Sequence, residues 1–116
     1  MPVLPGGHGN GSISVSGGQA SFTFSEQNGK PGHHFLSYSD PAHQFSFSTK
    51  KLSPVTVIGN HAHFTGTAKL GGKHGPTISF TVDVYDNGAS NDQFFLSASN
   101  GYSAGGTLTS GNIFIH

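Results

Sequence analysis

The chain of 116 residues has no cysteine, no tryptophan and no arginine, and only 9% of its residues are charged. An average soluble protein carries about 25% charged residues. Without cysteine, disulfide bonds, thiolate nucleophiles and cysteine-ligated metals are excluded. Five lysines balance five acidic residues, so the formal net charge is zero. An even charge without arginine argues against a phosphate-binding surface, and we expect no nucleic-acid partner.

Long apolar runs are also missing from the chain. None approaches the roughly 20 residues of a membrane span, so we expect no membrane-spanning segment. Residues 1–10 contain proline and glycine without alternation, and they lack the basic and apolar regions of a signal peptide. We therefore expect residues 1–10 to form a flexible leader. The protein is then either intracellular or a mature or trimmed form.

The chain does contain a clear alternation of apolar and polar residues. Serine or threonine alternates with apolar residues over residues 12–15, 21–24, 45–48 and 78–84, which is the pattern of half-buried strands. Turn signals recur about every ten residues. The pattern predicts an all-β domain over residues 11–116, an antiparallel meander of about eight to ten short strands forming a small β-barrel, with a β-sandwich as the alternative. The expected strands cover residues 11–16, 19–26, 33–39, 42–49, 53–58, 61–70, 76–85, 93–99, 102–108 and 111–116.

The turns also predict which residues face each other, because opposed residues in a hairpin share a face. We expect two-residue turns at Gly17-Gly18, Gly59-Asn60 and Ser110-Gly111, a loop over residues 71–75 and a turn after Tyr85. The opposed pairs are then Val15–Ala20, Val57–Ala62, Leu108–Ile113, Ala68–Ile78 and Val84–Phe94. The expected core is Ile13, Val15, Phe22, Phe24, Leu36, Phe45, Phe47, Val55, Val57, Phe64, Ile78, Phe80, Val82, Val84, Phe94, Leu96, Leu108, Ile113 and Ile115.

Histidine is the most unusual part of the composition, with eight residues, and it is the commonest metal ligand. His61 and His63 lie two apart on one predicted strand, so both side chains point outward. The inferred register places His63 opposite Asp83 and His61 opposite Tyr85. Two imidazoles and a carboxylate on a rigid sheet suit Zn²⁺, Cu²⁺ or Ni²⁺. The alternative is an ordinary cross-strand His63–Asp83 pair, worth roughly 0.2–1 kcal/mol.

A second cluster is expected on the inner face. If Asp40-Pro41 is the centre of a turn, Tyr38 opposes His43, and His34 faces inward on the same strand as Tyr38. Polar groups that converge in an apolar cup are typical of a small-molecule site. A histidine–tyrosine pair also suits acid–base chemistry. The alternatives are a hydrogen-bonded cap at the end of the barrel, or a bulge that turns His34 and His43 outward.

Other catalytic and ligand-binding patterns are weak or absent. Asp83, Asp86, Asn87 and Asp92 offer oxygen ligands suited to Ca²⁺, but their spacing differs from an EF-hand loop and Asp-Asn-Gly is a common turn sequence. Glu26 is the only glutamate, so no pair of glutamates exists for glycoside hydrolysis. No Gly-x-Ser-x-Gly elbow occurs. The sequence therefore predicts no catalytic residues and favours a protein that is not an enzyme.

Several segments resemble a known family. The closing run Gly101-Tyr102-Ser103-Ala104-Gly105-Gly106-Thr107-Leu108, followed by Gly111-Asn112-Ile113-Phe114-Ile115-His116, resembles the end of a bacterial β-domain called the post-COAP domain. Residues 55–60, 62–66 and 80–88 are similar to that family, and residues 38–40 match more loosely. The resemblance covers about residues 10–116. It implies a C-terminal module of secreted or surface proteins with no established activity. Many relatives carry a cysteine pair around the equivalent of residues 69–77, which this chain lacks.

These observations favour a non-enzymatic extracellular β-module with a structural, adhesive or self-assembly role. Self-association is plausible because a near-neutral surface resists it poorly. The first alternative is a small-molecule-binding or isomerase-like barrel that uses His34, Tyr38 and His43. The second alternative is a divalent metal binder, with Zn²⁺ or another divalent ion held by His61, His63 and Asp83. No other cofactor is expected.

Overall fold

The computed structural model describes residues 6–29, 34–71, 74–88 and 91–115, and the predicted all-β meander is confirmed there. The described part contains nine strands and one short 3₁₀ turn, η1, over Pro41–His43. The strands are β1 Gly6–Val15, β2 Gly18–Gln27, β3 His34–Asp40, β4 Phe45–Thr49, β5 Thr56–Ile58, β6 His61–Lys69, β7 Thr77–Tyr85, β8 Gln93–Ala98 and β9 Ser103–Ile115. No helix in these residues is long and apolar enough to cross a membrane.

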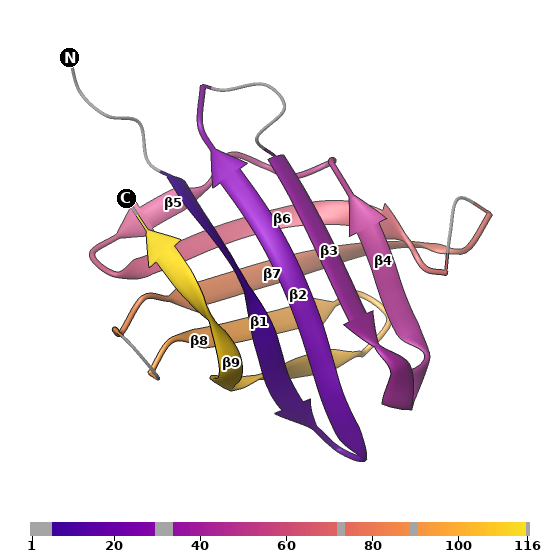
Figure 1. Ribbon diagram of the computed structural model, residues 1–116. Helices are drawn as coiled ribbons and strands as arrows, with labels where there is room; N and C mark the ends of the chain where they lie inside the picture. Colours follow the sequence, from indigo (N-terminus) through magenta and orange to yellow (C-terminus); the bar gives the residue numbers. More distant parts are fainter. Residues whose placement is uncertain (1–5, 30–33, 72–73, 89–90, 116) are drawn as a thin grey trace.

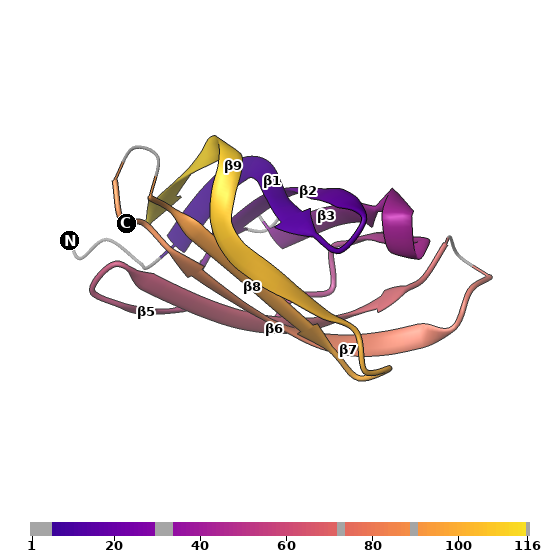
Figure 2. The same ribbon diagram turned by 90° about the horizontal axis from the view of Figure 1, so that it is seen from below.

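All nine strands belong to one antiparallel sheet that curls over on itself as a half-barrel (Figure 1). The order is β4-β3-β2-β1-β9-β8-β7-β6-β5, so the first and last strands, β1 and β9, pair at the centre of the sheet. Curling produces two layers whose strands cross, as Figure 2 shows from below. We call β1–β4 with residues 108–115 of β9 the front layer. We call β5–β8 with residues 103–107 of β9 the back layer.

Strand β9 belongs to both layers, which corrects the predicted turn at Ser110-Gly111. Residues 103–107 pair with β8, and residues 108–115 pair with β1. Gly111 has a φ of 95°, and a Cβ there would collide with the carbonyl oxygen of Asn10. Glycine is therefore needed where β9 crosses close to β1, next to an irregularity at Ser12/Ile13. The glycine marks a bend within one strand rather than a turn between two.

Strand β1 corrects the predicted leader. The leader was expected over residues 1–10, but residues 6–10 pair with both β2 and β9; residues 1–5 lie outside the described residues. The inward positions of this stretch are Gly7, Gly9 and Gly11. A Cβ at Gly9 would lie 2.6 Å from the carbonyl oxygen of Asn112. These glycines let neighbouring backbones and core rings approach closely. Linkers are also rich in glycine, so the sequence of this stretch resembles a flexible leader.

The back-layer registers are confirmed, because Val57 opposes Ala62, Ala68 opposes Ile78 and Val84 opposes Phe94. The predicted β1–β2 register is wrong by two residues, because Val15 opposes Gly18 and not Ala20. The turn is at Ser16-Gly17, where Gly17 has a φ of 84°, and Ile13 therefore opposes Ala20. The inward set does not change, because this shift keeps each residue on its predicted face.

The space between the layers is filled by side chains. Every predicted core residue is buried except Val15, Val57, Leu108 and Ile115, which are partly buried and pack against the core. Aromatic rings bridge the two layers: Phe22 stacks on Phe94 with centroids 4.0 Å apart, and Phe47 stacks on Phe80 at 5.0 Å. Tyr38 joins this core with 1% of its surface exposed. Such contacts give the dense packing of a protein interior.

Candidate functional site

The predicted pairing of Tyr38 with His43 is wrong, because the loop between β3 and β4 is longer than two residues. Asp40 ends β3, η1 follows, and Gln44 adopts a left-handed conformation with a φ of 52°. Tyr38 consequently opposes Phe47. His43 lies on η1 with 41% of its side chain exposed, so it does not line an interior.

Tyr38 and His43 nevertheless belong to one polar network, joined by two residues that were not singled out from the sequence. The Tyr102 hydroxyl donates to Oδ2 of Asp40 at 2.7 Å, and Nδ1 of His43 lies 2.8 Å from the same oxygen. The hydroxyl oxygens of Tyr38 and Tyr102 are 2.6 Å apart. Since Tyr102 uses its proton on Asp40, Tyr38 is the donor in that pair.

The environment keeps both phenols protonated. Burial raises the pKa of Tyr38 to about 12; the Tyr102 hydrogen bond opposes the rise and the charge of Asp40 adds to it. Burial and the bond to Asp40 also raise the pKa of Tyr102. Phe45, Phe47 and Phe94 pack around Tyr38. A ligand would therefore contact Tyr38 only after displacing these rings, and the network caps the core at one end.

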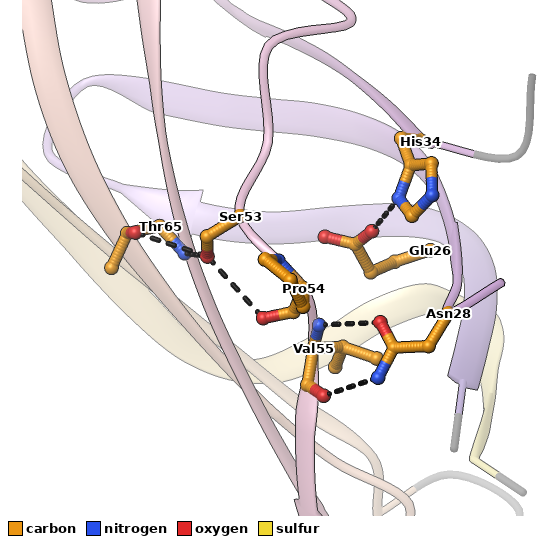
Figure 3. A network of polar contacts seen from close by, with 7 residues as sticks. All are labelled: Glu26, Asn28, His34, Ser53, Pro54, Val55 and Thr65. Carbon is orange, nitrogen blue, oxygen red and sulfur yellow. Dashed lines mark hydrogen bonds and ion pairs between the residues drawn. The ribbon is translucent and has the colours of Figure 1, made fainter. Parts of the chain in front are cut away.

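His34 lies apart from that network, beside Glu26. Nδ1 of His34 contacts Oε1 of Glu26, which is fully buried (Figure 3). Burial raises the pKa of Glu26, although the hydrogen bond and charge of His34 lower it. The other oxygen, Oε2, has no hydrogen-bond partner among the described residues. His34, Tyr38 and His43 therefore do not form one site.

The segment that leads into β5 passes close to this pair. Figure 3 shows the side chain of Asn28 bonded twice to the backbone of Val55, each time at 2.9 Å. The Ser53 hydroxyl accepts a hydrogen bond from the amide of Thr65 on β6. These bonds hold the β4–β5 connection against β2 on one side and β6 on the other. Asn28, two residues after Glu26, is thus bonded to the chain that joins the two layers.

The outer cluster is found as predicted, on the back layer. His63 opposes Asp83 and His61 opposes Tyr85. Nε2 of His61 and Nδ1 of His63 lie 2.7 and 2.9 Å from Oδ1 of Asp83. Burial raises the pKa of Asp83, but the hydrogen bonds and charges of His63 and His61 outweigh it, so the pKa is lowered. The His61 ring stacks on Tyr85 with centroids 4.4 Å apart.

Hydrogen bonding rather than chelation describes this cluster in the present arrangement. Both imidazoles point at one carboxylate oxygen. In the described residues, no group of three or more histidine, aspartate or glutamate side chains is arranged to hold a metal ion. The three candidate ligands are nevertheless together, which confirms the register from which they were inferred.

The acidic residues after Tyr85 have structural partners. The carboxylate of Asp92, 2% exposed, accepts hydrogen bonds from the amides of Asn87 at 2.9 Å and Ile113 at 2.7 Å. Asp86 accepts one from the amide of Ile115 at 3.3 Å. These carboxylates accept hydrogen bonds from backbone amides of β9 beyond Thr107, where β9 no longer pairs with β8. The preference for a turn over a Ca²⁺ loop agrees with these contacts.

The back layer also has a hollowed outer surface. Two adjoining open hollows of about 740 and 340 Å³ share Thr81 and Ser97, and we call them the outer groove. Hydroxyls from β6, β7 and β8 line it, and Phe95 and Gly105 lie at one end. A Cβ at Gly105 would collide with Cδ1 of Phe95. The Phe95 ring therefore lies across β9, with 38% of its surface exposed.

Comparison of the chain with protein-family models, curated proteins and solved structures gives no match. The resemblance to the post-COAP domain stays a prediction, as does the bacterial, extracellular setting that it implies. Functional inference for this chain therefore depends on the geometry of its own side chains.

Proposed function

We propose that the protein is a non-enzymatic, extracellular β-module with an adhesive role, acting through its outer surface. The filled interior is the observation that carries this proposal. Tyr38, the centre of the alternative small-molecule site, is 1% exposed and surrounded by core rings. The low charge and the hydroxyl-rich outer faces suit contact with a neutral partner.

The outer groove is the contact surface in this proposal. It combines the hydroxyls of Thr65, Thr81 and Ser97 with the exposed ring of Phe95 and the carboxylate of Asp83. Hydroxyl and carboxylate groups hydrogen-bond to sugar hydroxyls, and an aromatic ring packs against the apolar face of a sugar. We propose a neutral polysaccharide as the partner, because lysine and aspartate contribute few charges to the groove.

Retention on insoluble cellulose and chitin tests this function. Phe95→Ala should weaken retention by about tenfold, because an aromatic contact is worth about 0.5–1.5 kcal/mol beyond its buried area. Phe114→Ala is the matched control: Phe114 is the more exposed of the two rings at 49%, and it lies on the front layer. Failure of the wild type to bind either polysaccharide would reject the glycan role. Equal losses in both variants would indicate nonspecific adhesion.

Divalent metal binding by His61, His63 and Asp83 is a second candidate function, supported by the convergence of all three side chains. A Zn²⁺ ion would replace both histidine–carboxylate hydrogen bonds. Calorimetry with Zn²⁺ should give heat with the wild type and none with His63→Ala. Equal heats from both proteins would eliminate this site.

A further inference from the structure

The lysines and the acidic residues are distributed very differently in the fold, although the formal charge of the chain is zero. Glu26 and Asp40 are fully buried, and Asp92 is 2% exposed. Asp83 is bonded to two histidines, and Asp86 accepts the amide of Ile115. All five acidic residues are thus buried or engaged in contacts within the fold.

The described lysines, in contrast, are exposed and gather at one place. Lys50, Lys51 and Lys69 all line an open hollow of about 630 Å³ between the end of β4 and β6. We call it the seam hollow, because it lies where the two layers meet beyond the edge of β4. Among the described residues, none of these three ammonium groups has an acidic partner.

The walls of the seam hollow are fixed by hydrogen bonds to the backbone. The Thr49 hydroxyl donates to the carbonyl oxygen of Thr67 at 2.7 Å, and the Thr67 amide donates to the carbonyl oxygen of Lys51 at 3.1 Å. Phe35 and Ala68 provide apolar surface to the same hollow. The hollow is therefore a preformed site with an apolar part and three neighbouring cations.

We propose that the seam hollow binds a small anionic amphiphile, a carboxylate attached to an aliphatic chain. Three like charges around one hollow repel each other, and an anion would relieve this repulsion. The apolar walls would cover the chain of the ligand, and the volume lies in the range of about 300–1,000 Å³ usual for small-ligand sites. The seam hollow shares Lys51 and Thr67 with the outer groove, but Phe95 does not line it. Phe95→Ala therefore tests the glycan contact without altering the seam hollow.

Nuclear magnetic resonance titration of the whole chain with octanoate tests the proposal. We expect amide shifts at Thr67, Ala68 and Lys69, and weaker binding as salt is added because the lysines are exposed. Acetate carries the charge without the chain, and octanol carries the chain without the charge. Each should bind at least about tenfold more weakly than octanoate. Equal affinity for octanol and octanoate, or octanoate shifts confined to other residues, would overturn the proposal.

Variants separate this site from general charge effects. Lys50→Gln, Lys51→Gln and Lys69→Gln together should lower octanoate affinity by about tenfold. The matched control combines Ser14→Glu, Ser21→Glu and Asn112→Glu, three exposed positions on the outer face of the front layer. It changes the formal charge by the same three units and should keep the affinity. Equal loss in both variants, or binding to anionic vesicles without binding to octanoate, would contradict the proposal.

Discussion

The Glu26–His34 pair on the front layer and the Asp83 cluster on the back layer combine an acid with histidine in opposite surroundings. On the front layer, Glu26 is fully buried beside His34. On the back layer, Asp83 lies on the outer face, half-buried, between His61 and His63. Burial is the largest single cause at both acids and raises both pKa values. It prevails at Glu26, whose pKa is raised, but the hydrogen bonds and charges of two histidines together outweigh it at Asp83, whose pKa is lowered.

The comparison shows that a histidine partner does not by itself decide whether a carboxylate is stabilised as an anion. Desolvation favours the neutral acid, and hydrogen bonds from histidine favour the anion. One histidine does not offset full burial at Glu26, while two histidines outweigh partial burial at Asp83. The front-layer pairs therefore act as parts of the core, and the back-layer cluster remains available to solvent and ligands.

The largest expected difference between the layers is in the cost of removing an acid. Asp40→Ala leaves the part-buried hydroxyl of Tyr102 without its acceptor and removes the partner of His43, so it should lower the free energy of unfolding by about 3 kcal/mol. Asp83→Ala should cost less than about 1 kcal/mol, because its partners reach water. Urea denaturation measures both values, with Asp40→Asn as a control that keeps an acceptor. Equal losses would contradict the distinction between the layers.

The loss of folding stability at alkaline pH should depend on Tyr38, the buried phenol of the front layer. The pKa of Tyr38 is raised from 10.0 to about 12 in the folded protein. Its contribution to stability is therefore fully present below pH 10 and is lost as the pH rises through about 12. The loss should be about 2 kcal/mol. Tyr38→Phe should reduce this loss while costing about 1 kcal/mol at pH 9 through the missing hydrogen bond. An unchanged alkaline slope would contradict the assignment.

Glu26 should make the free energy of unfolding depend on pH as well, but less strongly than Tyr38 does. Its pKa is raised above the ordinary value of 4.5, so its stabilising contribution is complete below that pH and decreases as the pH rises through the folded pKa. Glu26→Gln should remove this decrease, a difference on the order of 1 kcal/mol. Urea midpoints from pH 4 to pH 8 measure it. The idea fails if wild type and variant show parallel profiles.

Asp83 should show the smallest effect, with the opposite sign. Its pKa is lowered from the ordinary value of 3.8, so its contribution is present above that pH and is lost as the pH falls through the folded pKa. Asp83→Asn should flatten this acid limb by about 0.5 kcal/mol, since exposed pairs are screened by water. The same urea series, extended to pH 2.5, provides the measurement. A steeper acid limb in the variant would contradict the lowered pKa.

The sequence predicted the back layer better than the front layer, for physical reasons. In β6, β7 and β8, apolar and polar residues alternate over long runs, and the placement of His61, His63 and Asp83 follows directly from the register. In β1 and β9, glycine permits close contact between strands and bends, and a sequence alone does not distinguish these uses from a leader or a turn.

The buried acids were missed although the alternation contained a signal. Glu26 continues the inward series of Phe22 and Phe24, and Asp40 continues that of Leu36 and Tyr38. A carboxylate is expected outside because burial is costly without partners. Those partners come from elsewhere in the chain, such as Tyr102, which is 62 residues from Asp40. The β3–β4 register was missed because η1 and the left-handed Gln44 lengthen a loop that Asp40-Pro41 alone suggests is tight.

The central pairing of β1 with β9 has a mechanical consequence. Gly7 lies opposite Ile115 in an antiparallel ladder, so the two described ends of the chain leave from neighbouring strands at the same end of the sheet. Because the bonds of such a ladder run perpendicular to the strands, a force that pulls these ends apart would load them one after another. The sheet would unzip from Gly7 and Ile115 rather than shear. If the protein were attached through only one of these ends, no pulling force would act across the β1–β9 ladder.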